Sequence, residues 1–363
     1  MNRFLAGTAA VLAAVLLLSC PAGAISANKA ILLEVETGRV IYEKRADEKS
    51  LIASTTKIMT ALIVCEQCNV LDRVQIPKEA VGIEGSSIYL QEGEVLTVQE
   101  LLYGMMLHSG NDAATALAIY CGGTVEGFAQ KMNDKARLLK LKNTHFVNPH
   151  GLDAPDHYST ARDLAHLARY AMANPIFAKT VSAKTVTVGS RTFTNHNKLL
   201  WRVEGAEGVK TGYTRAAGRI LVSAAQRQGR RLIAVTIEDG NDWADHAALY
   251  EQGFSGYAVC QVVEKGQSLG YLQVFGGEKT EVEIIAAEDF SYALRPDETP
   301  TIRLSQKGMT FAPVVQGGDA GFAWICLGDQ AVGKVAVEYA DTVELVPQPE
   351  KKKPWKKFFG ESL

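Results

Sequence analysis

The tetrapeptide Ser54-Thr55-Thr56-Lys57 constrains this chain most, because it places a hydroxyl three residues before an amine and directly precedes the apolar run 58–64. Such a run is typical of a buried helix. Residues i and i+3 share a helix face, so we expect the Lys57 amine beside the Ser54 hydroxyl, near the positive end of the helix dipole. A serine next to a base is a candidate nucleophile. Taken alone, the pattern also fits an N-cap serine followed by a surface lysine.

A second polar cluster, Ser109-Gly110-Asn111, lies between segments 98–107 and 112–120, whose apolar residues recur with helical spacing. Its serine can relay a proton, and its asparagine can both donate to and accept from a substrate amide. By itself the cluster also fits a turn between two helices. The polar segment 70–94 that precedes it fits either a loop that borders a cleft or a surface excursion.

A third cluster, Lys210-Thr211-Gly212-Tyr213, lies in the first of three segments that predict antiparallel strands, at 208–214, 218–225 and 231–237. On a strand edge, the lysine and threonine offer a cation and a hydroxyl to a substrate carboxylate. The glycine lets a ligand or another backbone approach closely, and free N–H groups can pair with an extended peptide. Segments 30–35 and 39–42 predict a hairpin that supplies edge strands.

The N-terminus predicts export. Residues 4–18 form an apolar run that is too short to span a bilayer, and Ala22-Gly23-Ala24 fits a cleavage site, so we expect a signal peptide over residues 1–24. A lipoprotein signal that ends before Cys20 is the alternative. The composition, with 47% hydrophobic residues, 21% charged residues and a net charge of −2, is that of an ordinary globular protein and carries no nucleic-acid signature.

Cysteine spacing gives no disulfide framework and no zinc site. Cys65-x-x-Cys68 has no second such pair and ends the predicted Ser54 helix. We expect buried thiols, with one disulfide within the trio Cys65, Cys68 and Cys121 as the alternative. The five cysteines after the predicted signal are Cys65, Cys68, Cys121, Cys260 and Cys326.

In this order, the three clusters resemble the low-molecular-mass penicillin-binding proteins, the serine D-alanyl-D-alanine carboxypeptidases. The stretches 148–152 and 158–163 also look like signatures of that family. The resemblance is strong over about 27–256 and looser to 346. It implies an α/β (α+β) fold of the serine β-lactamase/DD-peptidase type, in which helices cover both faces of an antiparallel sheet, with an added helical subdomain.

The resemblance also implies the catalytic roles. Ser54 would attack the carbonyl of the penultimate D-alanine and form an acyl-enzyme, which water then hydrolyses. Lys57 would be the general base, and burial together with the nearby Lys210 would lower the pKa of its amine. Ser109 would relay the proton to the leaving amine. No metal and no organic cofactor is expected.

For substrate binding, the resemblance implies that Lys210 and Thr211 hold the terminal carboxylate and that Asn111 holds the peptide amide. The expected oxyanion hole consists of the backbone N–H groups of Ser54 and of Tyr213, which follows Gly212. The expected partners are a peptidoglycan stem peptide that ends in D-Ala-D-Ala and β-lactam antibiotics. Some members have histidine in place of Tyr213 and arginine in place of His196, so we expect His196 to be a structural or rim residue.

Three other functions fit the sequence less well. A class A β-lactamase needs a deacylating glutamate, and residues 127–203 contain none. A zinc carboxypeptidase needs a ligand set, but His145, His150 and His157 lack the His-Glu-x-x-His pattern and fit turn or surface positions. A non-catalytic wall-binding protein would not need the intact Ser54 and Lys57.

The C-terminal third predicts a separate domain. Short alternating segments separated by Gly, Pro and Asp predict a small all-β sandwich over 265–346, after a catalytic domain over 25–264. The tail 347–363 contains five lysines interleaved with Trp355, Phe358 and Phe359. It fits either peripheral contact with an anionic membrane surface or a solvated tail. We therefore expect the mature protein in the cell envelope, at the outer face of the cytoplasmic membrane, or secreted.

Overall fold

The computed structural model describes residues 25–305 and 308–347. The expected signal peptide and the lysine-rich tail lie outside this part of the chain. Two compact units meet in the sequence between Tyr257 and Ala258. Within the described residues, no helix has both the length and the apolar content needed to cross a membrane.

The first unit is built on a five-stranded sheet in which every neighbouring pair is antiparallel, in the order β2-β1-β9-β8-β7. The expected hairpin and the three later strands are confirmed, and β7 lies at one edge. The strands are β1 (Lys29–Glu34), β2 (Val40–Lys44), β7 (Ala206–Thr214), β8 (Gly218–Arg227) and β9 (Arg230–Ile237).

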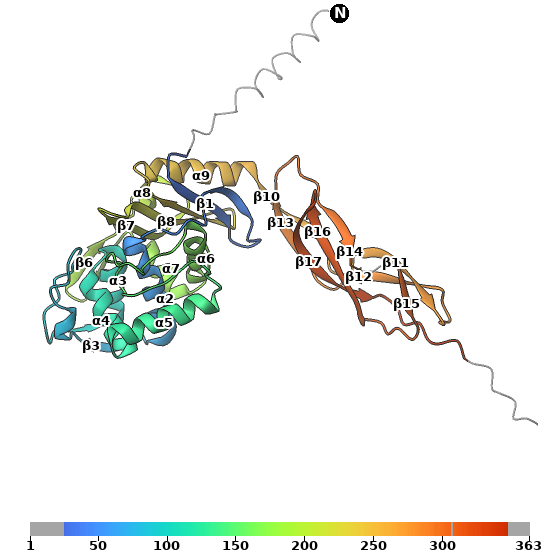
Figure 1. Cartoon of the computed structure of the whole chain (residues 1–363), viewed down its shortest axis with the longest axis horizontal. Coiled ribbons are helices and arrows are strands. Elements are labelled where there is room, and N and C mark those ends of the chain that lie inside the picture. Colours follow the sequence, from blue (N-terminus) through green and yellow to red (C-terminus); the bar gives the residue numbers. More distant parts are fainter. Residues whose placement is uncertain (1–24, 306–307, 348–363) are drawn as a thin grey trace, which may run out of the picture. The chain divides into compact units, whose positions relative to one another are not determined.

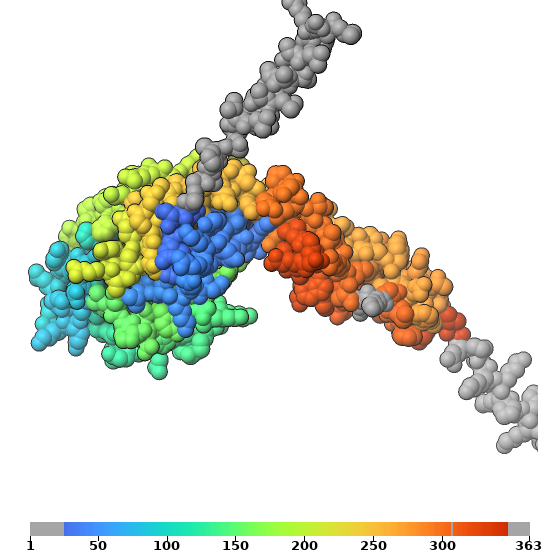
Figure 2. Space-filling view, turned by 45° about the horizontal axis from the view of Figure 1, so that its top comes forward, coloured from blue at the N-terminus to red at the C-terminus, as the bar shows by residue number. Residues whose placement is uncertain are grey.

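Alternating side chains of this sheet pack against helices on opposite faces. Leu32 and Ala234 share a core with Leu249 and Tyr250 of α9 (Asp242–Gly256). Their chain neighbours face the other core, which includes α2 (Lys57–Gln67) and α6 (Ala161–Met172). This follows from the period of two in a strand. On the surface, the N-terminal hairpin adjoins the α9 segment although the two are far apart in sequence (Figure 2).

The segment between β2 and β7 is mainly helical, as expected, and most of it lies on the α2 side of the sheet (Figure 1). Two small hairpins, β3 with β4 and β5 with β6, complete it. Its other helices are η1 (Ala53–Thr56), η2 (Lys78–Ala80), α3 (Val98–Leu107), α4 (Asn111–Gly122), α5 (Val125–Leu138), α7 (Pro175–Ser182) and α8 (Leu199–Arg202), and its strands are β3 (Arg73–Gln75), β4 (Val95–Thr97), β5 (Thr185–Val188) and β6 (Arg191–Thr194).

The second unit is all β, which confirms the expected class. A six-stranded sheet, β14-β16-β17-β12-β11-β15, and the pair β10-β13 share one apolar core. Because β10 pairs with β13, it falls in this unit, although the sequence pattern had placed 258–264 in the catalytic domain. The strands are β10 (Ala258–Val263), β11 (Ser268–Phe275), β12 (Glu281–Ala286), β13 (Phe290–Leu294), β14 (Thr301–Leu304), β15 (Met309–Phe311), β16 (Asp319–Leu327) and β17 (Gln330–Tyr339).

The cysteines differ in burial. The expectation of buried thiols is correct for Cys65 and Cys326 and wrong for the other three. Cys260 is exposed on the short β10-β13 sheet, while Cys68 and Cys121 are half-buried at the ends of two helices.

Candidate active site

Ser54 lies in the 3₁₀ turn η1, which leads directly into α2. Sequence reasoning placed it on the α-helix itself, but α2 begins only at Lys57. Residues i and i+3 eclipse one another in a 3₁₀ turn, so the lysine lies directly over the serine. The distance from Lys57 Nζ to Ser54 Oγ is 3.0 Å. The cap positions of η1 and α2 belong to Ile52 and Thr56, so the N-cap interpretation of Ser54 is wrong.

The Lys57 amine is fully buried and has two further acceptors. Nζ lies 2.6 Å from Asn111 Oδ1 and 2.7 Å from the carbonyl oxygen of His150. Burial and then the charge of Lys210 lower the pKa of Lys57 well below its usual value, while Asp112 acts in the opposite direction. A neutral amine can donate its two N–H bonds to Asn111 and His150. Its lone pair then faces the Ser54 hydroxyl, the geometry that a general base requires.

Lys210 lies on β7, the edge strand, and is also fully buried. Burial lowers the pKa of its amine to about 7. Its Nζ donates to the carbonyl oxygen of Thr211 at 3.0 Å. Gly212, which follows Thr211, leaves little room for a side chain, because a Cβ there would lie 3.2 Å from Ile52 O and 3.3 Å from Ser54 N. The strand edge therefore lies directly against the turn that carries the candidate nucleophile.

Ser109 connects α3 to α4 and brings a second hydroxyl to the site. It is buried and has a φ of 65°, in the left-handed region. Asn111 begins α4, and its Nδ2 donates to the carbonyl oxygen of Glu84 at 2.5 Å while its Oδ1 faces Lys57. The turn between the two helices is therefore aimed at Ser54 rather than at solvent.

Five of the eight expected site residues line a cavity of about 440 Å³. Lys57, Lys210 and Asn111 are buried behind its wall. His196 lines it as well, which agrees with a rim position. The expected residues that line the cavity are Ser54, Ser109, Thr211, Gly212 and Tyr213.

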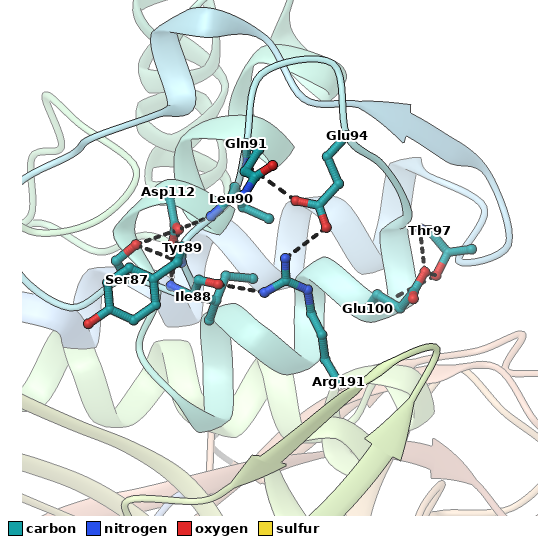
Figure 3. A network of polar contacts seen from close by, with 10 residues as sticks. All are labelled: Ser87, Ile88, Tyr89, Leu90, Gln91, Glu94, Thr97, Glu100, Asp112 and Arg191. Atoms are coloured by element: carbon teal, nitrogen blue, oxygen red, sulfur yellow. Dashed lines mark hydrogen bonds and ion pairs between the residues drawn. The ribbon is translucent and has the colours of Figure 1, made fainter.

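Asp112 was missed by sequence reasoning, and it anchors the loop that forms one wall. Its buried carboxylate accepts from Ser87 Oγ at 2.6 Å and from the backbone N–H groups of Ile88 and Leu90 (Figure 3). Arg191 supports the loop from another segment by donating to the carbonyl oxygen of Ile88. Ser86 of this loop lines the cavity, so segment 70–94 does border a cleft. The signal available in the sequence was that this acidic residue, Asp112, directly follows the candidate site residue Asn111.

Sequence reasoning also missed the residues that form the opposite rim of the cavity. Arg219 of β8 forms a bidentate ion pair with Asp242 at the start of α9, and its guanidinium lies over the Trp243 ring. All three side chains line the cavity. Arg219 pairs across the β7-β8 hairpin with Tyr213, so the strand register could have indicated its place. It adds a guanidinium group to the rim.

The expected turn or surface position is wrong for His157, which is buried, while His145 and His150 are half-buried. His157 Nδ1 accepts from Val147 N at 3.1 Å, so its Nε2 donates to Thr56 Oγ1 at 2.7 Å. His150 Nδ1 accepts from the backbone of Leu152. Over residues 25–305 and 308–347, no three His, Cys, Asp or Glu side chains are grouped so that they could hold a metal ion.

Comparison with known proteins agrees with this geometry. Residues 17–241 match the family described as D-alanyl-D-alanine carboxypeptidase. The chain belongs to this family. A second match, to the C-terminal domain of penicillin-binding protein 5, covers residues 257–345 of this carboxypeptidase family member.

Individual members of the family align over most of the chain. D-alanyl-D-alanine carboxypeptidase DacF of Bacillus subtilis is 33% identical over 313 residues, which cover 81% of this chain and 80% of DacF. Penicillin-binding protein 5 of Haemophilus influenzae superposes with a TM-score of 0.76 at 27% identity and covers 88% of this chain and 98% of its own. A variant of the Streptomyces K15 DD-transpeptidase superposes with a TM-score of 0.61 at 36% identity, over 64% and 98% of the two chains.

Proposed function

We propose that this chain is a serine carboxypeptidase that removes the terminal D-alanine from peptidoglycan stem pentapeptides and is acylated by penicillin. The observation that carries the proposal is the 3.0 Å contact between Ser54 Oγ and the buried Lys57 Nζ, beside an edge strand that can align a peptide. Family membership supplies the substrate class, since the relatives are named D-alanyl-D-alanine carboxypeptidases.

Acylation follows from the proposed roles. Neutral Lys57 takes the proton of Ser54, whose oxygen attacks the carbonyl carbon of the penultimate D-alanine. The negative charge on the carbonyl oxygen is stabilised by the backbone N–H groups of Ser54 and Tyr213. The bond to the terminal D-alanine then breaks, and Ser109 passes a proton to the departing amine. Water later attacks the ester and restores the Ser54 hydroxyl.

Substrate recognition uses the edge strand β7, which lies directly beside Ser54. The free carboxylate of the terminal D-alanine binds protonated Lys210 and the Thr211 hydroxyl, while Arg219 adds a second positive charge at the rim. The side-chain amide of Asn111 binds the peptide bond and holds Lys57 in place. Binding of the terminal carboxylate by these charged groups places the last peptide bond next to the nucleophile. This arrangement favours cleavage of that bond.

The location of the protein is part of the same proposal. Residues 1–24 direct export, the catalytic domain and the β-rich domain meet in the sequence between Tyr257 and Ala258, and the tail 347–363 contacts an anionic membrane surface from outside. N-terminal sequencing of the exported protein tests the first point, with Ile25 as the expected first residue. Vesicle sedimentation with and without anionic lipid, using the full chain and a chain that lacks the tail, tests the last.

The decisive experiment is mass spectrometry after incubation with penicillin, followed by assay of D-alanine release from a pentapeptide. We expect a stable adduct on Ser54, lost in Ser54→Ala and retained in the remote control Ser255→Ala. Release of D-alanine should be insensitive to a chelator. Rapid antibiotic turnover would indicate a β-lactamase, chelator-sensitive release would refute the serine mechanism, and absence of both adduct and release would leave a binding protein.

A further inference from the structure

We propose that Cys68 and Cys121 are a thiol pair that oxidises to a disulfide. This disulfide would link the far ends of the two helices that bear active-site residues. Cys68 is the C-cap of α2, and Cys121 lies in the last turn of α4. The two helices pack against each other, and the two thiols are within hydrogen-bonding reach. Cys65, the third cysteine nearby, is buried inside the core and does not share this position.

The pair lies in a solvent-reachable pocket. A polar cavity of about 360 Å³ is lined by Gln67, Cys68, Asp72, Tyr120, Cys121 and Lys131. Both thiols line it and both are half-buried, so a small disulfide can reach them. This pocket shares no lining residue with the cavity around Ser54.

The charges in the pocket distinguish the two thiols. The hydrogen bond from Cys68 and the nearby Lys131 ammonium stabilise a thiolate at Cys121, which lowers its pKa below the ordinary thiol value. The same hydrogen bond, burial and the Asp72 carboxylate raise the pKa of Cys68. Lys131 is held in place by Gln67 Oε1 at 2.9 Å, and Asp72 by the Tyr120 hydroxyl. Cys121 is therefore the attacking thiolate, and Cys68 completes the exchange.

The chemistry is thiol–disulfide exchange with a small or protein disulfide as the oxidant. The Cys121 thiolate attacks one sulfur of the oxidant, which forms a mixed disulfide and releases the other sulfur as a thiolate. Cys68 then loses its proton and attacks Cys121 Sγ, which expels the second oxidant thiolate. Two protein thiols lose two electrons and two protons, and the oxidant is reduced to two thiols. The sulfur atoms must approach to about 2.05 Å, which requires rotation of the two side chains.

The link would stabilise the active-site scaffold without blocking the site. Lys57 begins α2 and Asn111 begins α4, so the cysteines lie at the opposite helix ends. The link closes a long loop of the chain. This loop contains α3 and the loop around Ile88 and Leu90 that Asp112 holds against the cavity, called the wall loop. Closing a long loop restricts the unfolded chain. Export, where it occurs, exposes the thiols to oxidising conditions.

The test uses the full purified chain, reduced and then equilibrated with reduced and oxidised glutathione at neutral pH. Remaining thiols are alkylated after acid quenching, and the protein is mapped by mass spectrometry. We expect Cys68 and Cys121 to become protected together, with a linked peptide and a mass lower by two hydrogen atoms. Oxidation should raise Tm by about 5–10 °C. The control variants Cys65→Ser and Cys260→Ser should keep the link.

Single variants make the order of attack testable. In Cys68→Ser, Cys121 should retain a glutathione adduct that wild type resolves, whereas Cys121→Ser should react slowly at Cys68. Penicillin acylation of Ser54 checks that each variant is folded. The proposal is overturned if both Cys68 and Cys121 alkylate after oxidation, if the linked peptide contains Cys65, or if wild type retains glutathione on Cys121 without forming the link.

Discussion

At the scale of single residues, the proposed chemistry of the site depends on two buried lysines. Lys57 and Lys210 are both fully buried, and each has a lowered pKa for which burial is the main cause. The proposed base, Lys57, needs a neutral amine, while the proposed carboxylate site at Lys210 needs a charged one. Activity should therefore depend on pH through both groups, with opposite signs.

The first prediction concerns the pH profile of kcat/KM for D-alanine release, which reports the free enzyme. The rate should rise with pH as Lys57 loses its proton, at a pH far below that of an ordinary lysine. It should fall as pH rises through about 7, because Lys210 loses the charge that binds the carboxylate. A substrate with a C-terminal amide should lack the falling limb. An equal falling limb with both substrates would contradict the role of Lys210.

The second prediction concerns stability. The pKa of Lys210 is about 7 in the folded state, against an ordinary value of 10.5. Between these values the unfolded chain binds more protons, so the free energy of unfolding should increase with pH. Below pH 7, Lys210 is protonated in both the folded and the unfolded chain, so the full cost of burying its charge lowers the free energy of unfolding. We therefore expect Lys210→Met to be more stable than wild type at pH 6, by on the order of a few kcal/mol, with the difference shrinking towards pH 10.

Urea unfolding of both proteins at pH 6, 8 and 10 measures this difference, because the shifts of groups that do not interact with Lys210 cancel between them. The shift of Lys57 does not cancel, since the charge of Lys210 lowers its pKa in wild type. A difference that does not change with pH would mean that Lys210 is hydrated in the folded state. Lys210→Met should meanwhile lose D-alanine release, so greater stability would accompany lower activity.

At the scale of elements, two loops hold η1 and the cavity wall in place. The wall loop is held by Asp112 on α4, and the loop 148–152 packs behind η1, where Gly151 has a φ of 92°. A Cβ at Gly151 would lie 1.8 Å from the carbonyl oxygen of Ala53. Each loop places its own backbone against the site, in a position that an α-helix alone could not provide.

The third prediction is that Asp112→Ala loosens the wall loop. It removes the acceptor for the buried N–H groups of Ile88 and Leu90, which should cost about 2–3 kcal/mol of stability. KM for the pentapeptide should rise more than kcat falls, since Ser54 and Lys57 keep their contact. Asp112→Asn retains one acceptor oxygen and should restore part of the binding. Wild-type KM in Asp112→Ala would contradict an anchoring role.

The fourth prediction compares two glycines with positive φ. Gly151→Ala should push Ala53 and so displace Ser54, with a loss of about 2–4 kcal/mol in stability and loss of penicillin acylation. Gly82 also has a positive φ, but a Cβ there meets nothing within 4 Å. Gly82→Ala should cost only about 1 kcal/mol and leave acylation intact. Thermal unfolding and acylation rates decide the comparison, and equal effects would refute the close-approach argument.

At the scale of the whole molecule, each of the two units has its own apolar core. The catalytic unit buries residues on both faces of its sheet, and the second unit buries the inner faces of its β-strands. Every residue that lines the proposed active site belongs to the first unit.

The fifth prediction follows from this division. A chain that ends at Tyr257 should fold and release D-alanine at a rate within about twofold of the full chain, since a domain with its own core folds independently. Circular dichroism and the D-alanine assay provide the measurement. An unfolded or inactive truncated chain would show that the β-rich unit is required by the catalytic one.

The expected site residues were predictable because their signals are local. The spacing of Ser54 and Lys57, the Ser109-Gly110-Asn111 turn and the Lys210-Thr211-Gly212 strand each combine a few side chains with one element of regular structure. Apolar periodicity then predicted the sheet and the buried helix. One detail that failed was the 3₁₀ turn at Ser54, since the end of a helix depends on packing as well as on propensity.

The sequence by itself therefore determined the main elements, the antiparallel sheet and the chemical groups of the site. Only the tertiary structure decided that the His150 carbonyl holds Lys57, that Asp112 anchors the wall loop, that Arg219 meets Asp242 and Trp243 at the rim, and that Cys68 lies beside Cys121. These contacts join segments far apart in the chain. Each depends on how packed elements align in space, and neither side-chain type nor local spacing carries that information.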